Sequence, residues 1–367
     1  MAQTAARKPA APPVLRALGW FWGAVLLALA GGGGVLQWLG PPPARPAAPA
    51  PMPAAAVAPM VPAPPTAGLE PSDEQAGPQP AAPQPGAVAP PDKALLEASA
   101  TFPGGMLPRI GPSGRTAMHV YAARFDAADK RPRVALMLSG IGMSETDSEE
   151  AIHTLPAAIS LAISPYAFRP ERLLADARAA GHETLLSLPL EPDRYPIDDP
   201  GNRALLTGNQ PALNAQRLEW ALTRFAGYVG ATGALNGLRG ERFASANELM
   251  APVLDEMTQR GLLYIDPRPG AAHPPRATGR AVDVVVDEPA VRTEIEENLA
   301  RLEQVAHDKG SALGMAGMPR PVTLDRIAAW AATLGSRGLL LVPVSALATP
   351  PPEMQPKATA ASEKTAP

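Results

Sequence analysis

The sequence predicts an α/β protein whose core is a (β/α) barrel of about seven to eight parallel strands. Short apolar segments follow one another from residue 133 to residue 344, and amphipathic helical patterns fill most of the intervals between them. About eight units of this kind is the number that can close into a barrel. The predicted strands are 133–142, 159–164, 183–190, 232–238, 262–266, 282–287, 312–318 and 339–344.

The first of these segments, 133–142, organises the rest of the chain. Its apolar run ends in Gly140 and Gly142, just before a helix start. This pattern is typical of a strand that is buried on both faces and that finishes where a ligand can come close.

Capping residues predict where the helices begin and end. Ser144 precedes several acidic residues and is an N-cap candidate for a helix that reaches Thr154. Pro170 opens the next helix and Gly181 closes it. Further helices are predicted over 214–226, 246–260, 291–309 and 323–334, each followed by glycine. The segment 191–211 has no periodicity, so we expect a long and functional loop over one face of the barrel.

The amino terminus predicts the location of the protein. Residues 17–39 are apolar except for Gln37, and three basic residues precede them. Such a run spans a bilayer, and positive flanks stay in the cytoplasm. We therefore expect a single-pass inner-membrane protein with residues 1–16 in the cytoplasm and the barrel in the periplasm. A cleaved signal peptide is the alternative, because 28–30 (Ala-Leu-Ala) is similar to a cleavage site, but the apolar run continues past it.

Composition divides the remainder of the chain. Proline and alanine dominate residues 40–114, which we expect to form a disordered tether between the membrane and a folded domain at 115–348. A similar tail, 349–367, is expected to be disordered. The net charge of −3, without a basic cluster interleaved with aromatic residues, argues against nucleic-acid binding. The absence of cysteine excludes disulfides and thiolate metal sites.

Several of the predicted strands and the turns that follow them carry motifs. They read SGIG at 139–142, ISLAISPY at 159–166, GHETLLSLPLE at 181–191, ALNGLRGERF at 234–243, LLYIDPR at 262–268 and VDVVVD at 282–287. In order and spacing this series resembles the divergent polysaccharide deacetylase family over residues 133–347. The resemblance implies the distorted (β/α) barrel of carbohydrate deacetylases and a role in carbohydrate metabolism at the cell envelope.

The chain departs from this family at the positions that would hold a metal. The family has two adjacent aspartates where Ser139 and Gly140 stand, and histidines at the positions of Ser187, Leu238 and Met318. By resemblance these positions supply a general base and metal ligands, which the residues present cannot provide. We therefore expect no metal and no other cofactor.

The spacing of the five histidines also argues against a metal site, independently of the family resemblance. No two of them stand at a spacing typical of metal ligands, so a structural or surface role is favoured for each. They are His119, His153, His182, His273 and His307.

Polar residues nevertheless remain at the carboxyl ends of the predicted strands, where barrel enzymes carry their active sites. We take Asp266 and Glu191 as candidate catalytic residues. The candidates for binding a substrate are Asn236, Arg239, Glu241, Arg242, Arg268 and Asp287. The alternative for Asp266 is structural, because this carboxylate could neutralise Arg239, Arg242 or Arg268 across the mouth of the barrel.

Three functional hypotheses follow. The first is an envelope carbohydrate deacetylase, weak or inactive because its metal ligands are lost. The second is a membrane-tethered, non-catalytic barrel that binds an envelope glycan or a periplasmic protein. The third is metal-free hydrolysis by Glu191 and Asp266, with Arg268 stabilising an oxyanion. Carboxylates alone can also recruit magnesium or calcium through water, and Glu191, Asp266 and Asp287 are the candidates for that.

Overall fold

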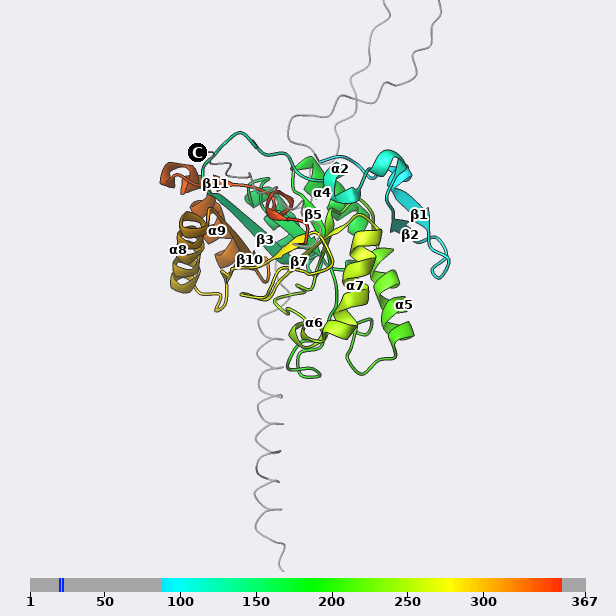
Figure 1. Ribbon diagram of the computed structural model, residues 1–367. Helices are drawn as coiled ribbons and strands as arrows, with labels where there is room; N and C mark the ends of the chain where they lie inside the picture. Colours follow the sequence, from blue (N-terminus) through cyan, green and yellow to red (C-terminus); the bar gives the residue numbers. More distant parts are fainter. Residues whose placement is uncertain (1–19, 21, 23–87, 352–367) are drawn as a thin grey trace, which may run out of the picture. The chain divides into compact units, whose positions relative to one another are not determined.

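The computed structural model describes residues 88–351 together with Trp20 and Trp22 (Figure 1). The predicted cytoplasmic tail 1–16, nearly all of the predicted membrane segment 17–39, the tether up to residue 87 and the tail from residue 352 lie outside the described residues. Within the described part of the chain, no helix is long and apolar enough to cross a membrane.

The core of the domain is a curled sheet in which every neighbouring pair of strands is parallel. Its order is β8-β7-β6-β5-β4-β3-β10-β9, and β11 pairs with the start of β3. Each of the eight segments predicted from the sequence contains or overlaps a strand, so the predicted parallel α/β core is confirmed. The strands are β3 (Arg133–Ile141), β4 (Ser160–Ile163), β5 (Thr184–Ser187), β6 (Gly230–Thr232), β7 (Leu263–Asp266), β8 (Gly279–Ala281), β9 (Val284–Val285), β10 (Ser311–Ala316) and β11 (Leu340–Leu341).

The two ends of this sheet meet along one segment of the chain. Only Val282 and Asp283 separate β8 from β9. The backbone N–H of Val282 donates to the carbonyl of Asp266 at 2.9 Å, and that of Asp283 donates to the carbonyl of Leu313 at 2.8 Å. One extended segment thus contacts β7 with its first half and β10 with its second half, which explains why the barrel is distorted rather than regular.

Helices cover the outside of the sheet. Ser144 is the N-cap of α3, because its hydroxyl accepts from the backbone N–H of Asp147 at 3.3 Å. Proline occupies the first turn of α4, α5 and α9. The helices are α2 (Ala117–Val120), α3 (Glu145–Thr154), α4 (Pro170–Ala179), α5 (Pro211–Leu222), α6 (Glu241–Ser245), α7 (Asn247–Gln259), α8 (Arg292–Lys309) and α9 (Pro321–Leu334), with 3-10 turns η3 (Gly335–Arg337) and η4 (Val344–Leu347).

The helix predicted over 214–226 lies earlier than expected. It begins at Pro211, ends at Leu222 and does not reach Gly227. Phe225 and Tyr228 instead pack edge to face in the core, with ring centroids 5.4 Å apart, and this contact requires the chain to leave the helix. The short helix α6 was not predicted, because five residues are too few to show a helical period.

The prediction of a structureless tether is wrong for residues 88–114. This segment forms the 3-10 turns η1 (Lys93–Leu95) and η2 (Pro112–Gly114) and an antiparallel hairpin of β1 (Leu96–Ala98) and β2 (Met106–Pro108). Leu95 and Leu107 are buried in the core of the domain. At its other end the described chain is ordered past residue 348, because Thr349 pairs with Gly279 through two backbone hydrogen bonds of 2.9 and 3.0 Å.

The long segment before α5 is a loop, as predicted. It carries no helix or strand between Ser187 and Pro211, and it is fixed to the barrel by a bridge between Leu190 and Leu205. Leu205 is fully buried, so the loop packs on the carboxyl end of the sheet.

Candidate functional site

The topology brings the candidate residues to one end of the barrel. Each lies at or just after the carboxyl end of a strand: Glu191 after β5, the segment 236–242 after β6, Asp266 and Arg268 at β7, and Asp287 after β9. Because the strands are parallel, these ends form one mouth. The structure therefore brings the candidates to a single face, where the charged ones form separate ion pairs.

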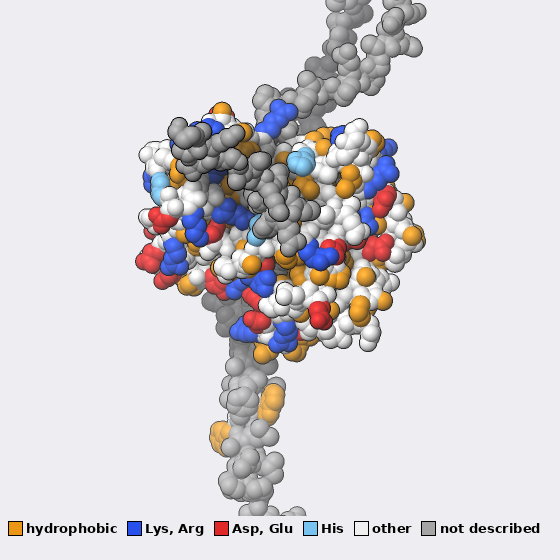
Figure 2. All heavy atoms as spheres, in the orientation of Figure 1, with side chains coloured by type: hydrophobic (Ala, Val, Ile, Leu, Met, Phe, Trp, Pro, Cys, Tyr) orange, Lys and Arg blue, Asp and Glu red, His pale blue; other side chains and the backbone are white. Residues whose placement is uncertain are grey.

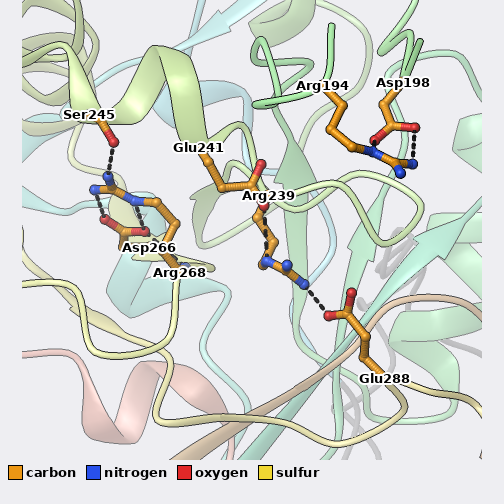
Figure 3. Close-up of polar contacts among 8 residues, drawn as sticks. All are labelled: Arg194, Asp198, Arg239, Glu241, Ser245, Asp266, Arg268 and Glu288. Atoms are coloured by element: carbon orange, nitrogen blue, oxygen red, sulfur yellow. Dashed lines mark hydrogen bonds and ion pairs between the residues drawn. The ribbon is translucent and has the colours of Figure 1, made fainter.

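Asp266 and Arg268 form a two-point ion pair (Figure 3). The guanidinium contacts the carboxylate through two parallel hydrogen bonds, Nε to Oδ1 at 2.9 Å and Nη2 to Oδ2 at 2.6 Å. The backbone N–H of Arg268 also donates to Oδ1, and Nη1 donates to the hydroxyl of Ser245 at 3.0 Å. The pairing with Asp266 raises the pKa of Arg268. The structure thus contains the ion pair that the structural alternative for Asp266 predicts, with Arg268 as the partner.

Glu191 is held by its own arginine and by the long loop. Its Oε1 lies 3.1 Å from Nη1 of Arg242, and its Oε2 accepts from the backbone N–H and the hydroxyl of Thr207, the latter at 2.8 Å. Burial acts to raise the pKa of Glu191, but the hydrogen bonds from Thr207 and Arg242 outweigh it and lower that pKa. This carboxylate is thus kept ionised, and it also fixes the loop.

Arg239 links the β6 loop to the β9 loop. It contacts Glu241 at 3.1 Å and Glu288 at 2.5 Å (Figure 3). Glu288 was not among the residues singled out from the sequence, although it directly follows Asp287 at the end of a predicted strand. In the described chain, no hydrogen bond or ion pair joins Glu191 to Asp266, so the two candidate catalytic carboxylates do not act on each other.

Asp287 lies at the junction of β9, β10 and β3. It accepts from the backbone N–H of Gly317 at 2.8 Å and is almost fully buried. Burial raises the pKa of Asp287, and the hydrogen bonds from Gly317 and Met318 oppose this shift without cancelling it. The hydroxyl of Ser139 donates to the carbonyl of Gly317 at 2.7 Å, so the end of β3 is tied to the same turn.

A side chain at Gly140 would be crowded and strained. Its φ is +78°, and a Cβ atom there would lie 3.2 Å from both the carbonyl oxygen of Gly317 and Cδ of Pro319. Where the family resemblance places an aspartate, this chain packs β3 directly against the turn after β10. The backbone conformation and the close packing at this position therefore favour glycine over a residue with a side chain.

Two buried oxygen atoms at the mouth have no hydrogen-bond partner among the described residues. They are Oγ of Ser187, at the end of β5, and Oδ1 of Asn236, after β6. Asn236 adopts a left-handed conformation with a φ of 51°, in a tight turn closed by two backbone hydrogen bonds between Leu235 and Leu238. Buried polar atoms usually have a partner, so an ordered water is the expected partner of these two.

Exposed apolar side chains stand in the loops that follow the strands. Phe168 is 88% exposed and Ile197 is 83% exposed, and Met143 and Val291 are each 49% exposed. They follow β4, β5, β3 and β9 respectively, so all four lie at the end of the barrel that carries the mouth. The sequence alone does not single them out, because an apolar residue in a loop gives no sign of its exposure.

The donor set at this mouth does not fit a catalytic metal. No group of three His, Asp or Glu residues that could hold a metal ion occurs in the part of the chain that the structure describes. The carboxylates present are engaged by arginines or by backbone N–H groups, whereas a catalytic zinc needs three free protein ligands. His182 lies at the opposite end of β5, where its ring nitrogens face the backbone carbonyls of Ile159 and Ile152 at 2.8 and 3.0 Å.

Comparison with known proteins identifies the family. The sequence model described as divergent polysaccharide deacetylase matches residues 136–348. The crystal structure of an uncharacterized protein from Agrobacterium tumefaciens C58 is 33% identical in sequence, with a TM-score of 0.62, and the match covers 66% of this chain and 99% of that chain.

Two structures of named deacetylases match more weakly. The catalytic domain of a peptidoglycan N-acetylglucosamine deacetylase from Eubacterium rectale ATCC 33656 is 11% identical with a TM-score of 0.37, covering 61% of this chain and 93% of that domain. A structure described as T48 deacetylase with substrate is 13% identical with a TM-score of 0.39, covering 61% and 94%. No curated protein matches. On the family match and the Agrobacterium structure, this chain belongs to the divergent polysaccharide deacetylase family.

Proposed function

We propose that this protein binds an envelope glycan at the mouth of its barrel and does not deacetylate it by a metal-dependent reaction. The observation that carries the proposal is the state of the two candidate catalytic carboxylates: Asp266 is bound bidentately by Arg268, and Glu191 by Arg242 and Thr207. A general base needs a pKa near the working pH. The hydrogen bonds from Thr207 and Arg242 lower the pKa of Glu191 below its ordinary value.

Binding is supported by the groups that remain unpaired. The partly buried Asn236, whose Oδ1 has no partner among the described residues, places an amide at the mouth, and the exposed Phe168 offers an apolar surface to the ring carbons of a sugar. Arg239 and Arg242 border the mouth and are held in place by carboxylates. These features give orientation and affinity, with no activated nucleophile.

The proposal includes a location. Residues 17–39 would hold the protein in the inner membrane, with the barrel on the periplasmic side. Amino-terminal sequencing of the mature protein tests this part. A start at Gly31 would show that the segment is cleaved and would remove the anchor, without bearing on the glycan site.

The binding proposal is tested with the purified full chain and N-acetylated chitin oligosaccharides. Calorimetry should show binding, and acetate release should stay at the blank level with zinc, magnesium or calcium added. Asn236→Gly removes the amide while tolerating the left-handed backbone, so it should weaken binding. Gln259→Ala, an exposed amide at the end of α7, is the matched control and should leave binding unchanged.

The opposite result is equally specific. Stoichiometric zinc with acetate release that disappears in Asp266→Ala would show an active metal-dependent deacetylase. Acetate release without metal, lost in Glu191→Gln, would favour metal-free hydrolysis instead.

A further inference from the structure

A large groove lies outside the sheet, between the β1–β2 hairpin, α5 and α7. Its volume is about 1330 Å³, and none of the eight candidate residues of the mouth lines it. Figure 1 shows α5 and α7 running beside each other with the hairpin near one end of the pair. The glycan site proposed above does not use this groove.

The walls of the groove are tied together by side chains. The hydroxyls of Ser99 and Thr101, in the hairpin, donate to the two carboxylate oxygens of Glu219 on α5 at 2.7 and 2.8 Å. Arg260, just after α7, contacts Glu97 at 3.0 Å and donates to the carbonyl of Pro108 at 2.8 Å. The groove is therefore formed before any ligand binds, which reduces the entropy lost on binding.

The floor of the groove is apolar. Core side chains form its base, and more exposed apolar residues of α5 and α7 lie above them: Leu213 is 37% exposed, Pro252 is exposed and Leu249 is partly buried. Phe243 is the one aromatic residue in the lining, and it is 1% exposed, so no aromatic plane is offered to a sugar ring. The principal apolar residues are Leu107, Leu205, Leu218, Phe243, Leu249 and Val253.

The rim of the groove is acidic. Four glutamates line it, Glu97, Glu219, Glu248 and Glu256, against the single cation Arg260. Arg260 is already shared between Glu97 and Glu256. Glu248 is exposed in the first turn of α7 and makes no hydrogen bond or ion pair with any described residue. Figure 2 shows acidic side chains among hydrophobic ones on the side of the molecule where α5 and α7 lie.

We propose that this groove binds a basic amphipathic α-helix of a partner protein. The apolar floor matches one face of such a helix, and the glutamates of the rim match Lys or Arg beside that face. The groove is long enough for a short helix. Its flanking helices α5 and α7 have 12 and 13 residues. At about 1.5 Å per residue each is roughly 18 to 20 Å long, which matches three to four turns of a bound helix. This site is separate from the mouth and gives the barrel a protein partner in addition to a glycan.

The probe is a labelled 14-residue peptide with leucines at helical spacing and lysines beside them, titrated with the full chain in detergent while anisotropy is measured. The same peptide with glutamates in place of the lysines is its counterpart and should bind at least tenfold more weakly. Glu248→Lys should weaken binding of the basic peptide by roughly three- to tenfold at low salt, and less at high salt. Glu171→Lys is the matched control, since Glu171 is also exposed in the first turn of a helix, α4.

A second pair of variants tests the floor. Leu213→Gln should weaken binding at both salt concentrations, because the apolar contact is not screened. Val291→Gln changes an exposed apolar residue at the start of α8, outside the groove, and should have no effect. Equal binding of the acidic peptide, or an equal loss in Glu171→Lys, would overturn the proposal. Displacement of the peptide by chitin oligosaccharides would also overturn it. A third contrary result is that no peptide binds and that this chain instead forms a dimer, which Leu213→Gln dissociates.

Discussion

Asp266 and Arg268 are two residues apart in sequence, yet their side chains meet in a two-point ion pair at the end of β7. The turn after the strand lets the guanidinium fold back on the carboxylate, and Ser245 from α6 holds its third nitrogen. A pair of this kind fixes geometry more than it supplies reactivity. We therefore expect the mouth of the barrel to be a rigid binding surface.

Breaking this pair should cost stability. Asp266→Ala leaves a guanidinium that is only about a quarter exposed without its partner, so we expect the free energy of unfolding to fall by roughly 1–3 kcal/mol, below the range for fully buried pairs. Chemical denaturation measures the free energy of unfolding. A double-mutant cycle with Arg268→Ala separates the interaction energy of the pair from the other effects of each substitution. A coupling energy near zero would contradict the rigid-mouth interpretation.

Asp287 should make stability depend on pH in a definite direction. Burial raises its pKa above the ordinary value of 3.8, so the folded protein holds this proton more tightly than the unfolded chain. Its contribution is therefore fully present below pH 3.8 and is lost as the pH rises through the folded-state pKa. The free energy of unfolding of the wild type, relative to Asp287→Asn, should decrease over that interval in urea titrations. Asp325→Asn, at an exposed site on α9, is the control. It shows how the free energy of unfolding changes with pH when an exposed aspartate is replaced.

Gly140 should resist substitution for two separable reasons. A side chain there meets both a left-handed φ of +78° and the close atoms of Gly317 and Pro319. Gly338 has a similar φ of +75° but no atom within 4 Å of a Cβ position. Gly338→Ala should therefore lose about 1–2 kcal/mol from backbone strain alone, and Gly140→Ala should lose more. Equal losses in thermal or urea unfolding would show that the packing at β3 is loose enough to have held an aspartate.

The hairpin should be part of the protected domain. Limited proteolysis of the full chain should leave a core that begins near residue 88, because Leu95 and Leu107 are buried and the hairpin is bonded to α5 and α7. Mass spectrometry of the resistant fragment locates its start. A stable core that begins at residue 115 would show that the hairpin detaches, and the preformed groove would then lack one wall.

The parallel core could be predicted because long apolar runs such as 133–142 dominate their local sequence, and glycine or proline marks most helix ends. The hairpin could not, because its strands have three residues each and follow a proline-rich stretch that hides their period. At the mouth, the sequence placed the charged residues at the correct strand ends. It could not choose among Arg239, Arg242 and Arg268 for Asp266, because that choice depends on how each loop turns back. Nor could it show that Glu248 and Leu213 share a groove, since this requires the packing of two separate helices.

The pairing of β10 with β3, far apart in sequence, has a consequence for synthesis of the chain on the ribosome. β3 to β7 pair with their neighbours in order, but β10 returns to β3, with Ser311 opposite Arg133. One edge of β3 therefore lacks its partner until residue 316 has emerged. Unpaired strand edges are templates for association between chains. Products truncated before β10 should aggregate, whereas truncation after Pro351 leaves β3 paired with β4, β10 and β11.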